Sequence, residues 1–235
     1  MEKLPIIALD LNGEEAISFL KQFDEQLFVK VGMELFYESG PSIIRDIKLL
    51  GHKIFLDLKL HDIPTTVQKA MKQLAALDVD LVNVHAAGGL QMMEAAVQGL
   101  YEGAENRKRP VIIAVTQLTS TSQEQMQNEQ QIQGELIHSV QHYAALAKKA
   151  GLDGVVCAAT DCRHLVNELG TDFHYITPGI RPEGISANDQ VRTATPAEAA
   201  QLGASAIVVG RAITGSENPV QSYHQIKKEW SGTDE

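Results

Sequence analysis

The sequence is poor in cysteine and aromatic residues, and it has no long apolar run. Among its 235 residues there are two cysteines, Cys157 and Cys162, and 5% are aromatic. Two cysteines cannot supply a four-ligand zinc site by themselves, so we expect two free, buried thiols in a reducing cytoplasm. No stretch of about 18 consecutive apolar residues is present, and we therefore expect no membrane-spanning helix.

Basic residues are also in short supply. Lysine and arginine together number 20 against 30 acidic residues, which gives a formal net charge of -10. Proteins that bind nucleic acid or anionic membranes in general present a basic face, so we expect neither partner. A small anionic ligand held by a few local cations remains compatible with this balance.

The first residues, Met1–Pro5, do not show a basic segment followed by an apolar stretch and a cleavage site. That pattern marks secretory signals, so we expect a cytoplasmic protein.

Short apolar runs alternate with longer amphipathic segments along the chain, of which 44% is hydrophobic. Near-continuous apolar runs are typical of strands buried on both faces. We expect eight strands, at 6–10, 27–31, 53–59, 81–85, 111–116, 154–157, 173–177 and 206–210. Helical periodicity and terminal proline or glycine predict helices at 14–23, 41–50, 66–77 and 136–150.

This alternation predicts the α/β class and a single-domain (β/α)8 TIM barrel over residues 1–235. A doubly wound open sheet is the alternative. It usually has fewer strands at this length, and no Gly-x-Gly-x-x-Gly follows the first predicted strand.

Polar residues end most of the predicted strands. They are Asp10, Lys30, Asp57, Lys59, His85, Thr116 and Arg211. In a barrel these strand ends converge on one mouth, where catalytic groups sit. A single charge there is explained by solvation of a strand end, but a series with both signs interleaved favours an active site.

The densest cluster is the segment from Asp57 to Thr66. Because strand side chains alternate, Asp57 and Lys59 are expected to point into the barrel, with Cα atoms about 6.5–7 Å apart. Asp62 follows where the chain turns, and Pro64 fixes that turn before a helix. The alternative is a buried ion pair between Asp57 and Lys59 that has only a structural role. Apolar residues in place of such a pair are often equally stable, so stability alone does not account well for three charges in this segment.

The last predicted strand ends in Gly210-Arg211. Glycine lets the backbone approach a ligand closely, and arginine grips phosphate with two hydrogen bonds. Loops after strands seven and eight hold phosphate in many barrels. Upstream, the polar loop 178–193 contains Arg181 and Gln190, and it is either a segment that closes over a ligand or a connection without a role.

Four segments together resemble the orotidine 5′-phosphate decarboxylase family. They are Asp57-x-Lys59-x-x-Asp62, Val115–Ser120, Thr177–Arg181 and Val208–Arg211. The first motif is shared with sugar-phosphate decarboxylases and aldolases of the same barrel group. The four segments together, in this order, are specific for the orotidine 5′-phosphate decarboxylase family, and the resemblance extends over nearly the whole chain.

The resemblance implies decarboxylation of orotidine 5′-phosphate to uridine 5′-phosphate in pyrimidine biosynthesis, without a cofactor or metal, by a homodimer with shared active sites. Lys59 would protonate C6 of the pyrimidine. The implied catalytic residues are Lys30, Asp57, Lys59 and Asp62. The implied substrate-binding residues are Asp10, Lys30, Asp57, Lys59, Asp62, Ile63, Thr66, Thr119, Ser120, Pro178, Arg181, Gln190, Gly210 and Arg211.

In these implied roles, Asp62, Ile63 and Thr66 reach into the neighbouring subunit's site. Asp10 and Lys30 hold ribose hydroxyls, and Thr119 and Ser120 contact the pyrimidine edge. Arg181, Gln190, Gly210 and Arg211 hold the phosphate.

Two other functions stay open on the residues alone: a metal-dependent sugar-phosphate decarboxylase or aldolase, and a non-catalytic phosphosugar-binding barrel. A metal would draw on His85, Asp57 and Asp62, but two lysines pointing into the same space compete with a cation. Thr119, Ser120 and Gln190 favour the nucleotide, because a base needs edge contacts that a sugar phosphate does not.

Overall fold

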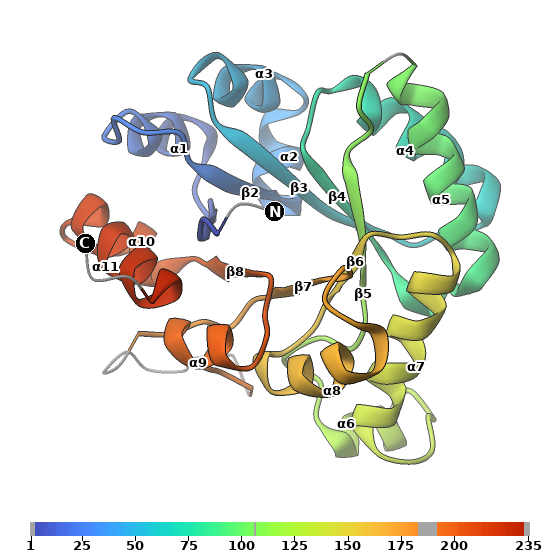
Figure 1. Ribbon diagram of the computed structural model, residues 1–235. Helices are drawn as coiled ribbons and strands as arrows, with labels where there is room; N and C mark the ends of the chain where they lie inside the picture. Colours follow the sequence, from blue (N-terminus) through green and yellow to red (C-terminus); the bar gives the residue numbers. More distant parts are fainter. Residues whose placement is uncertain (1–2, 106, 183–191, 233–235) are drawn as a thin grey trace.

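The computed structural model describes residues 3–105, 107–182 and 192–232. These residues form a closed barrel of eight parallel strands in which each strand pairs with its neighbours in chain order and β8 closes on β1 (Figure 1). The strands are β1 (Ile6–Ala8), β2 (Phe28–Gly32), β3 (Lys53–Leu60), β4 (Leu81–His85), β5 (Val111–Val115), β6 (Gly154–Val156), β7 (His174–Thr177) and β8 (Ala206–Val209). The predicted TIM barrel is confirmed, and the open sheet is wrong.

Helices surround the strands and separate each one from the next. They are α1 (Gly13–Leu20), α2 (Met33–Ser39), α3 (Ser42–Leu49), α4 (Pro64–Ala76), α5 (Gly89–Ala104), α6 (Gln123–Asn128), α7 (Leu136–Lys149), α8 (Ala159–Leu169), α9 (Pro196–Gln201), α10 (Arg211–Thr214) and α11 (Pro219–Ser231), with a short 3₁₀ turn, η1 (Ala86–Gly88). Four of them, α1, α3, α4 and α7, correspond to the predicted helices.

Local sequence explains where several helices begin. Asn12 accepts the backbone N–H of Glu15, whose carboxylate accepts the N–H of Asn12 in return, so that α1 starts with a capping box. Pro64 occupies the first turn of α4. Backbone N–H groups there have no acceptor within the helix, so the absence of an N–H in proline costs no hydrogen bond. These signals set the direction in which the chain leaves each strand.

The core has two layers. Inside the barrel lies a small cluster that the strands alone contribute: Ile6, Ala8, Phe28, Phe55, Leu81, Ile113, Ile176, Ala206 and Val208. A larger cluster packs the outward strand side chains against the helices, and Leu56 and Leu58 of β3 belong to it. This alternation matches the prediction that Asp57, between these two residues, points into the barrel.

Strand β3 is irregular where regular alternation was predicted. Lys59 has φ 51°, in the left-handed region, and the pairing of β3 with β4 shifts between Leu56 and Leu60. The backbone N–H of Lys59 donates to the Asn83 side-chain oxygen at 2.8 Å. Expecting ordinary strand geometry through residue 59 was therefore wrong, because a side chain of β4 takes this N–H at a bulge.

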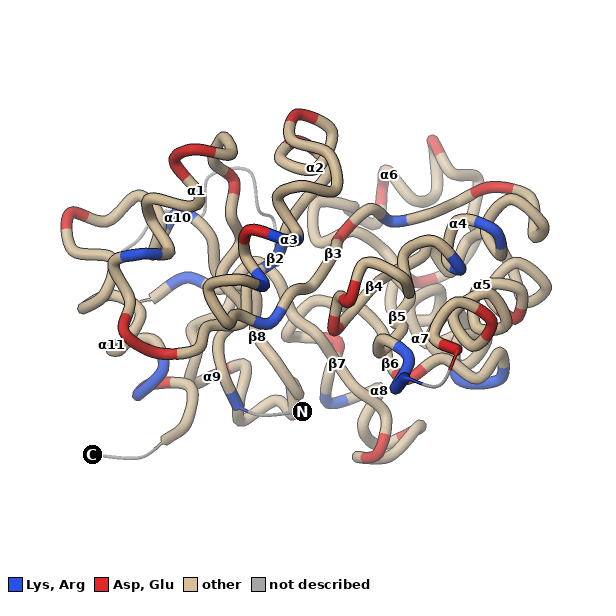
Figure 2. The backbone as a smooth tube through the Cα atoms, turned by 90° about the horizontal axis from the view of Figure 1, so that it is seen from above, with Lys and Arg blue, Asp and Glu red and all other residues tan. Residues whose placement is uncertain are grey.

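Charged positions are interspersed around the outside of the molecule (Figure 2).

Both cysteines are free and buried, as predicted. Among the described residues, no helix combines the length and apolar character that crossing a bilayer requires.

Candidate active site

A cavity of about 220 Å³ opens at the carboxyl ends of the strands, where the sequence places its polar residues. Its lining comes from seven strands and the loops that follow β5 and β7. The lining residues are Lys30, Phe55, Asp57, Lys59, Asn83, Val115, Gln117, Leu118, Thr119, Ser120, Val156, Ile176, Pro178 and Val208.

Asp57 stands at the centre of a row of alternating charges. Its Oδ1 accepts a hydrogen bond from Lys59 Nζ at 2.7 Å, and its Oδ2 lies 3.7 Å from Lys30 Nζ. Lys30 Nζ lies in turn 3.5 Å from Asp10 Oδ1. From the segment after β1 across β2 and β3, the order is therefore Asp10, Lys30, Asp57 and Lys59, which brings together four residues that the sequence placed at one mouth.

Burial is uneven along this row. The Asp57 side chain is 10% exposed, whereas that of Asp10 is 58% exposed at the rim. A buried carboxylate is stable only if charges or hydrogen-bond donors compensate its lost hydration, and Asp57 has three such groups around it. The two lysine ammonium groups are thus held on the two sides of one fixed anion.

The opposite side of the cavity is mostly apolar. Val115, Val156, Ile176 and Val208 contribute its strand residues. The predicted residues Thr119, Ser120 and Pro178 also line the cavity, and Thr119 is buried. Thr116, in contrast, does not line the cavity, and its Oγ1 donates to the Val156 carbonyl at 2.8 Å.

The three predicted residues around the start of α4 lie outside this cavity. Asp62 and Ile63 precede α4 and Thr66 is in its first turn, and all three are exposed, Ile63 by 64%. The Asp62 carboxylate accepts the N–H of Ile63 at 2.7 Å. The described residues of a single chain therefore do not bring Asp62 into the charge row.

The predicted phosphate-binding residues follow β7 and β8. Gly210 approaches Asp10 closely, because a Cβ at this position would lie 3.3 Å from Asp10 Oδ2. Arg211 begins α10 directly after it. The N–H of Arg181 donates to the Ala194 carbonyl at 2.9 Å, and Gln190 lies outside the described residues.

The profile of the orotidine 5′-phosphate decarboxylase / HUMPS family matches residues 3–226. This chain belongs to that family. A protein from Staphylococcus haemolyticus (strain JCSC1435) named orotidine 5′-phosphate decarboxylase is 59% identical over 233 residues, which are 99% of this chain and 100% of the relative.

Solved structures give the same relationship. The orotidine 5′-phosphate decarboxylase of Lactobacillus acidophilus is 43% identical, with a TM-score of 0.88 over 97% of this chain and 99% of that one. An uncharacterised conserved protein from Geobacillus kaustophilus is 47% identical, with a TM-score of 0.86 over 96% and 99% of the two chains. The resemblance inferred from the motifs to the orotidine 5′-phosphate decarboxylase family is therefore confirmed.

One neutral residue that contacts the charge row was not predicted. Asn83 of β4 donates from Nδ2 to Asp57 Oδ1 at 2.6 Å and accepts the backbone N–H of Lys59. It thereby orients both partners of the Asp57–Lys59 pair. The signal was present in the sequence as a polar residue in the middle of the apolar run Leu81–His85.

His85 ends β4 beside the charge row without lining the cavity. Burial lowers its pKa, the charges of His61 and Lys59 lower it further, and Asp57 opposes them. The rings of His61 and His85 are 5.9 Å apart. In the described ranges, no three His, Cys, Asp or Glu side chains gather as a metal site would require, so the set His85, Asp57 and Asp62 is not assembled within one chain.

Proposed function

We propose that this chain decarboxylates orotidine 5′-phosphate to uridine 5′-phosphate and carbon dioxide, without a cofactor. The observation that carries the proposal is the row Asp10, Lys30, Asp57 and Lys59 at the cavity mouth. Family membership and the names of the relatives support the same substrate.

The reaction explains why the site needs a fixed ammonium group. Breaking the bond between C6 and the carboxylate leaves an electron pair in an sp² orbital at C6, where the ring has no carbonyl arranged to delocalise it. Lys59 Nζ supplies a positive charge beside this pair and then donates a proton to it. The resulting amine of Lys59 recovers its proton from water after product release.

Asp57 aims the ammonium group. Its hydrogen bond of 2.7 Å holds Lys59 Nζ in place before substrate arrives, so little reorganisation is needed as the carbanion develops. Asp57 also repels the substrate carboxylate, and that repulsion falls as neutral carbon dioxide forms, which makes a secondary contribution.

The phosphate supplies binding energy far from the bond that breaks. Enzymes lower barriers by about 8–23 kcal/mol, and a reaction with so poorly stabilised a carbanion needs the upper part of that range. No single side chain provides this much. In our proposal Arg181, Gln190, Gly210 and Arg211 hold the phosphate, and that interaction is used to organise the charge row around the pyrimidine.

The working enzyme is, in our proposal, a homodimer with shared sites. Asp62, Ile63 and Thr66 are exposed on one protomer and lie next to the charged segment of β3. A twofold-related copy would bury the exposed Ile63 and bring Asp62 to the charge row of its partner. The buried free thiols Cys157 and Cys162 fit a reducing cytoplasm, and we place the reaction there.

Mixing two inactive variants tests the shared site. Lys59→Ala and Asp62→Ala protomers, unfolded together and refolded, form hybrid dimers in which one site has Lys59 from one chain and Asp62 from the other. Random pairing then predicts about a quarter of wild-type activity. A mixture that stays inactive although hybrids have formed would show that each site lies within one chain.

The reaction itself is tested by the ultraviolet absorbance of orotidine 5′-phosphate in excess chelator. Conversion to uridine 5′-phosphate by the wild-type protein is the expected result. A folded protein that leaves the absorbance unchanged, but acts on sugar phosphates once magnesium is added, would overturn the proposal.

A further inference from the structure

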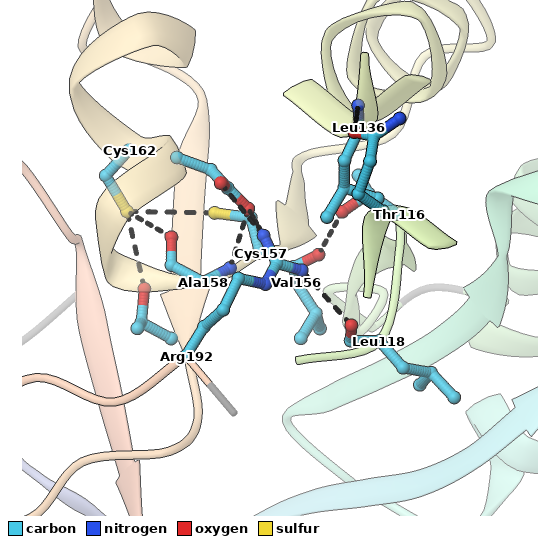
Figure 3. A network of polar contacts seen from close by, with 11 residues as sticks. Thr116, Leu118, Leu136, Val156, Cys157, Ala158, Cys162 and Arg192 are labelled. Carbon is cyan, nitrogen blue, oxygen red and sulfur yellow. Dashed lines mark hydrogen bonds and ion pairs between the residues drawn. The ribbon is translucent and has the colours of Figure 1, made fainter. Parts of the chain in front are cut away.

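Arg192 joins two loops and the first turn of a helix, and it does not line the cavity. Its Nη1 donates to both carboxylate oxygens of Asp161, at 2.7 and 3.0 Å, and its Nη2 donates to the Leu118 carbonyl at 3.1 Å. Figure 3 shows its guanidinium group with the dashed line to Leu118. Arg192 lies between β7 and α9, Asp161 in the first turn of α8 after β6, and Leu118 in the loop after β5.

Asp161 is a fixed anchor for this arginine. Its side chain is 8% exposed, and its Oδ2 also accepts the backbone N–H of Ala158 at 3.2 Å. The hydrogen bond to Ala158 ties the carboxylate to the start of α8. Arg192 is therefore held against a rigid helix end.

The Leu118 carbonyl is part of the turn that carries two predicted base-binding residues. It accepts the N–H of Thr121 at 2.9 Å as well as the Arg192 donor. Thr119 and Ser120 lie between these two ends of the turn, and with Leu118 they line the cavity. Arg192, which does not line the cavity, thus contacts the turn at its first carbonyl.

The guanidinium group is largely shielded from water. The Arg192 side chain is 16% exposed, and its Nε is buried without a hydrogen-bond partner among the described residues. Interactions of a desolvated cation are stronger than those of an exposed one, and removing a partner leaves a charge uncompensated. The contacts with Asp161 and Leu118 are therefore expected to be strong enough to fix the turn.

We propose that Arg192 is a positioning residue that holds the Leu118–Thr121 turn in the geometry required to contact the pyrimidine. This inference rests on the proposed function and on the contact with the pyrimidine edge that the family resemblance implies for Thr119 and Ser120. Arg192 acts on the base through this turn and does not itself touch the substrate.

Comparing the affinities for two ligands distinguishes this positioning role from a general structural role. Uridine 5′-phosphate carries a base, whereas ribose 5-phosphate has the same phosphate and a sugar without a base. In Arg192→Gln, titration calorimetry should show the affinity for uridine 5′-phosphate falling about tenfold more than that for ribose 5-phosphate, the size expected for loss of one charge-assisted hydrogen bond. The turnover of orotidine 5′-phosphate by Arg192→Gln should fall together with the affinity for uridine 5′-phosphate.

Matched variants complete the experiment. Arg163→Gln makes the same change at an exposed position of α8 and should leave both affinities unchanged. Arg192→Lys retains a cation beside Asp161 but lacks the planar guanidinium group that contacts Asp161 and Leu118 together. Compared with Arg192→Gln, it should therefore restore the free energy of unfolding more than the preference for uridine 5′-phosphate over ribose 5-phosphate. If Arg192→Gln fails to fold, Asp161→Asn and Arg192→Lys provide the same comparison.

Equal losses for the two ligands would overturn the inference and place Arg192 on the phosphate side, where the Ala194 carbonyl accepts from Arg181. Unchanged affinities in folded Arg192→Gln would overturn it as well. Failure of the proposed function looks different, because the wild-type protein would then not convert orotidine 5′-phosphate at all.

Discussion

The two walls of the cavity differ sharply in chemistry although they belong to one continuous barrel. Strands β2 to β4 contribute the charged wall, whose polar residues are Lys30, Asp57, Lys59 and Asn83, and Asp10, just after β1, extends the row of charges at the rim. Strands β5 to β8 contribute the apolar wall, with Val115, Val156, Ile176 and Val208. The same backbone therefore presents a fixed row of charges on one side and a surface of low polarity on the other.

The difference indicates that the two walls have separate roles in the proposed reaction. In the proposed mechanism, the charges are held on the side where the substrate carboxylate leaves and a carbanion forms. The apolar wall would exclude water from the other side of the ring, so that each charge would act through a medium of low dielectric constant. Changes to the charged wall should thus affect chemistry most, and changes to the apolar wall should have smaller effects.

The largest effect is expected from Lys59→Ala. This change removes both the proton donor and the positive charge beside C6, so kcat should fall by at least about 10⁴-fold. Steady-state assays of orotidine 5′-phosphate consumption measure it, with Lys69→Ala on the exposed side of α4 as the control. Residual activity within tenfold of wild type would assign the chemistry to another group.

Asn83→Ala should have the next largest effect. It removes the donor to Asp57 and the acceptor for the Lys59 N–H, so the pair loses its orientation while its charges remain. We expect kcat to fall about 10–100-fold, the scale of one or two charge-assisted hydrogen bonds, with a smaller change in KM. Asn167→Ala, on an exposed position of α8, is the matched control, and equal behaviour of the two variants would refute the positioning role of Asn83.

The apolar wall is tested by Val208→Thr. The substitution adds a hydroxyl to the cavity at nearly constant size, and we expect kcat to fall by less than about tenfold. Val209→Thr makes the same change on β8, but Val209 faces the helices. It should lower the free energy of unfolding without changing kcat, and a larger kcat loss in this control would contradict the division between the walls.

The smallest effect concerns pH and stability. The pKa of His85 in the folded protein lies below its ordinary value of 6.5 because of burial and the nearby His61 and Lys59. The unfolded chain then binds more protons as pH falls below 6.5, so the free energy of unfolding should decrease there. Urea unfolding at pH 7.5 and 5.5 measures the decrease.

His85→Gln should reduce this pH dependence in part, whereas His164→Gln, at an exposed position, should not. Part of the dependence should persist because burial also lowers the pKa values of His52 and His174. An identical pH dependence in wild type and His85→Gln would show that His85 does not contribute.

Much of the fold and most of the charged wall were predictable because they depend on local pattern. Apolar runs located all eight strands to within two residues at each end, and polar strand ends pointed to Lys30, Asp57 and Lys59. The left-handed backbone of Lys59 was not predictable, since it depends on a side chain of the neighbouring strand. Arg192 was missed for a similar reason, because its partner Leu118 is 74 residues away in the chain.

The most direct test of the charged wall follows the proton itself. By microscopic reversibility, a group that delivers a proton to C6 of the product also removes it. Uridine 5′-phosphate incubated with the protein in heavy water should therefore exchange its C6 hydrogen for deuterium, and NMR spectroscopy detects the loss of that signal. We predict exchange with the wild-type protein and none above the uncatalysed rate with Lys59→Ala. Exchange that persists in Lys59→Ala would contradict the assignment of Lys59 as the proton donor.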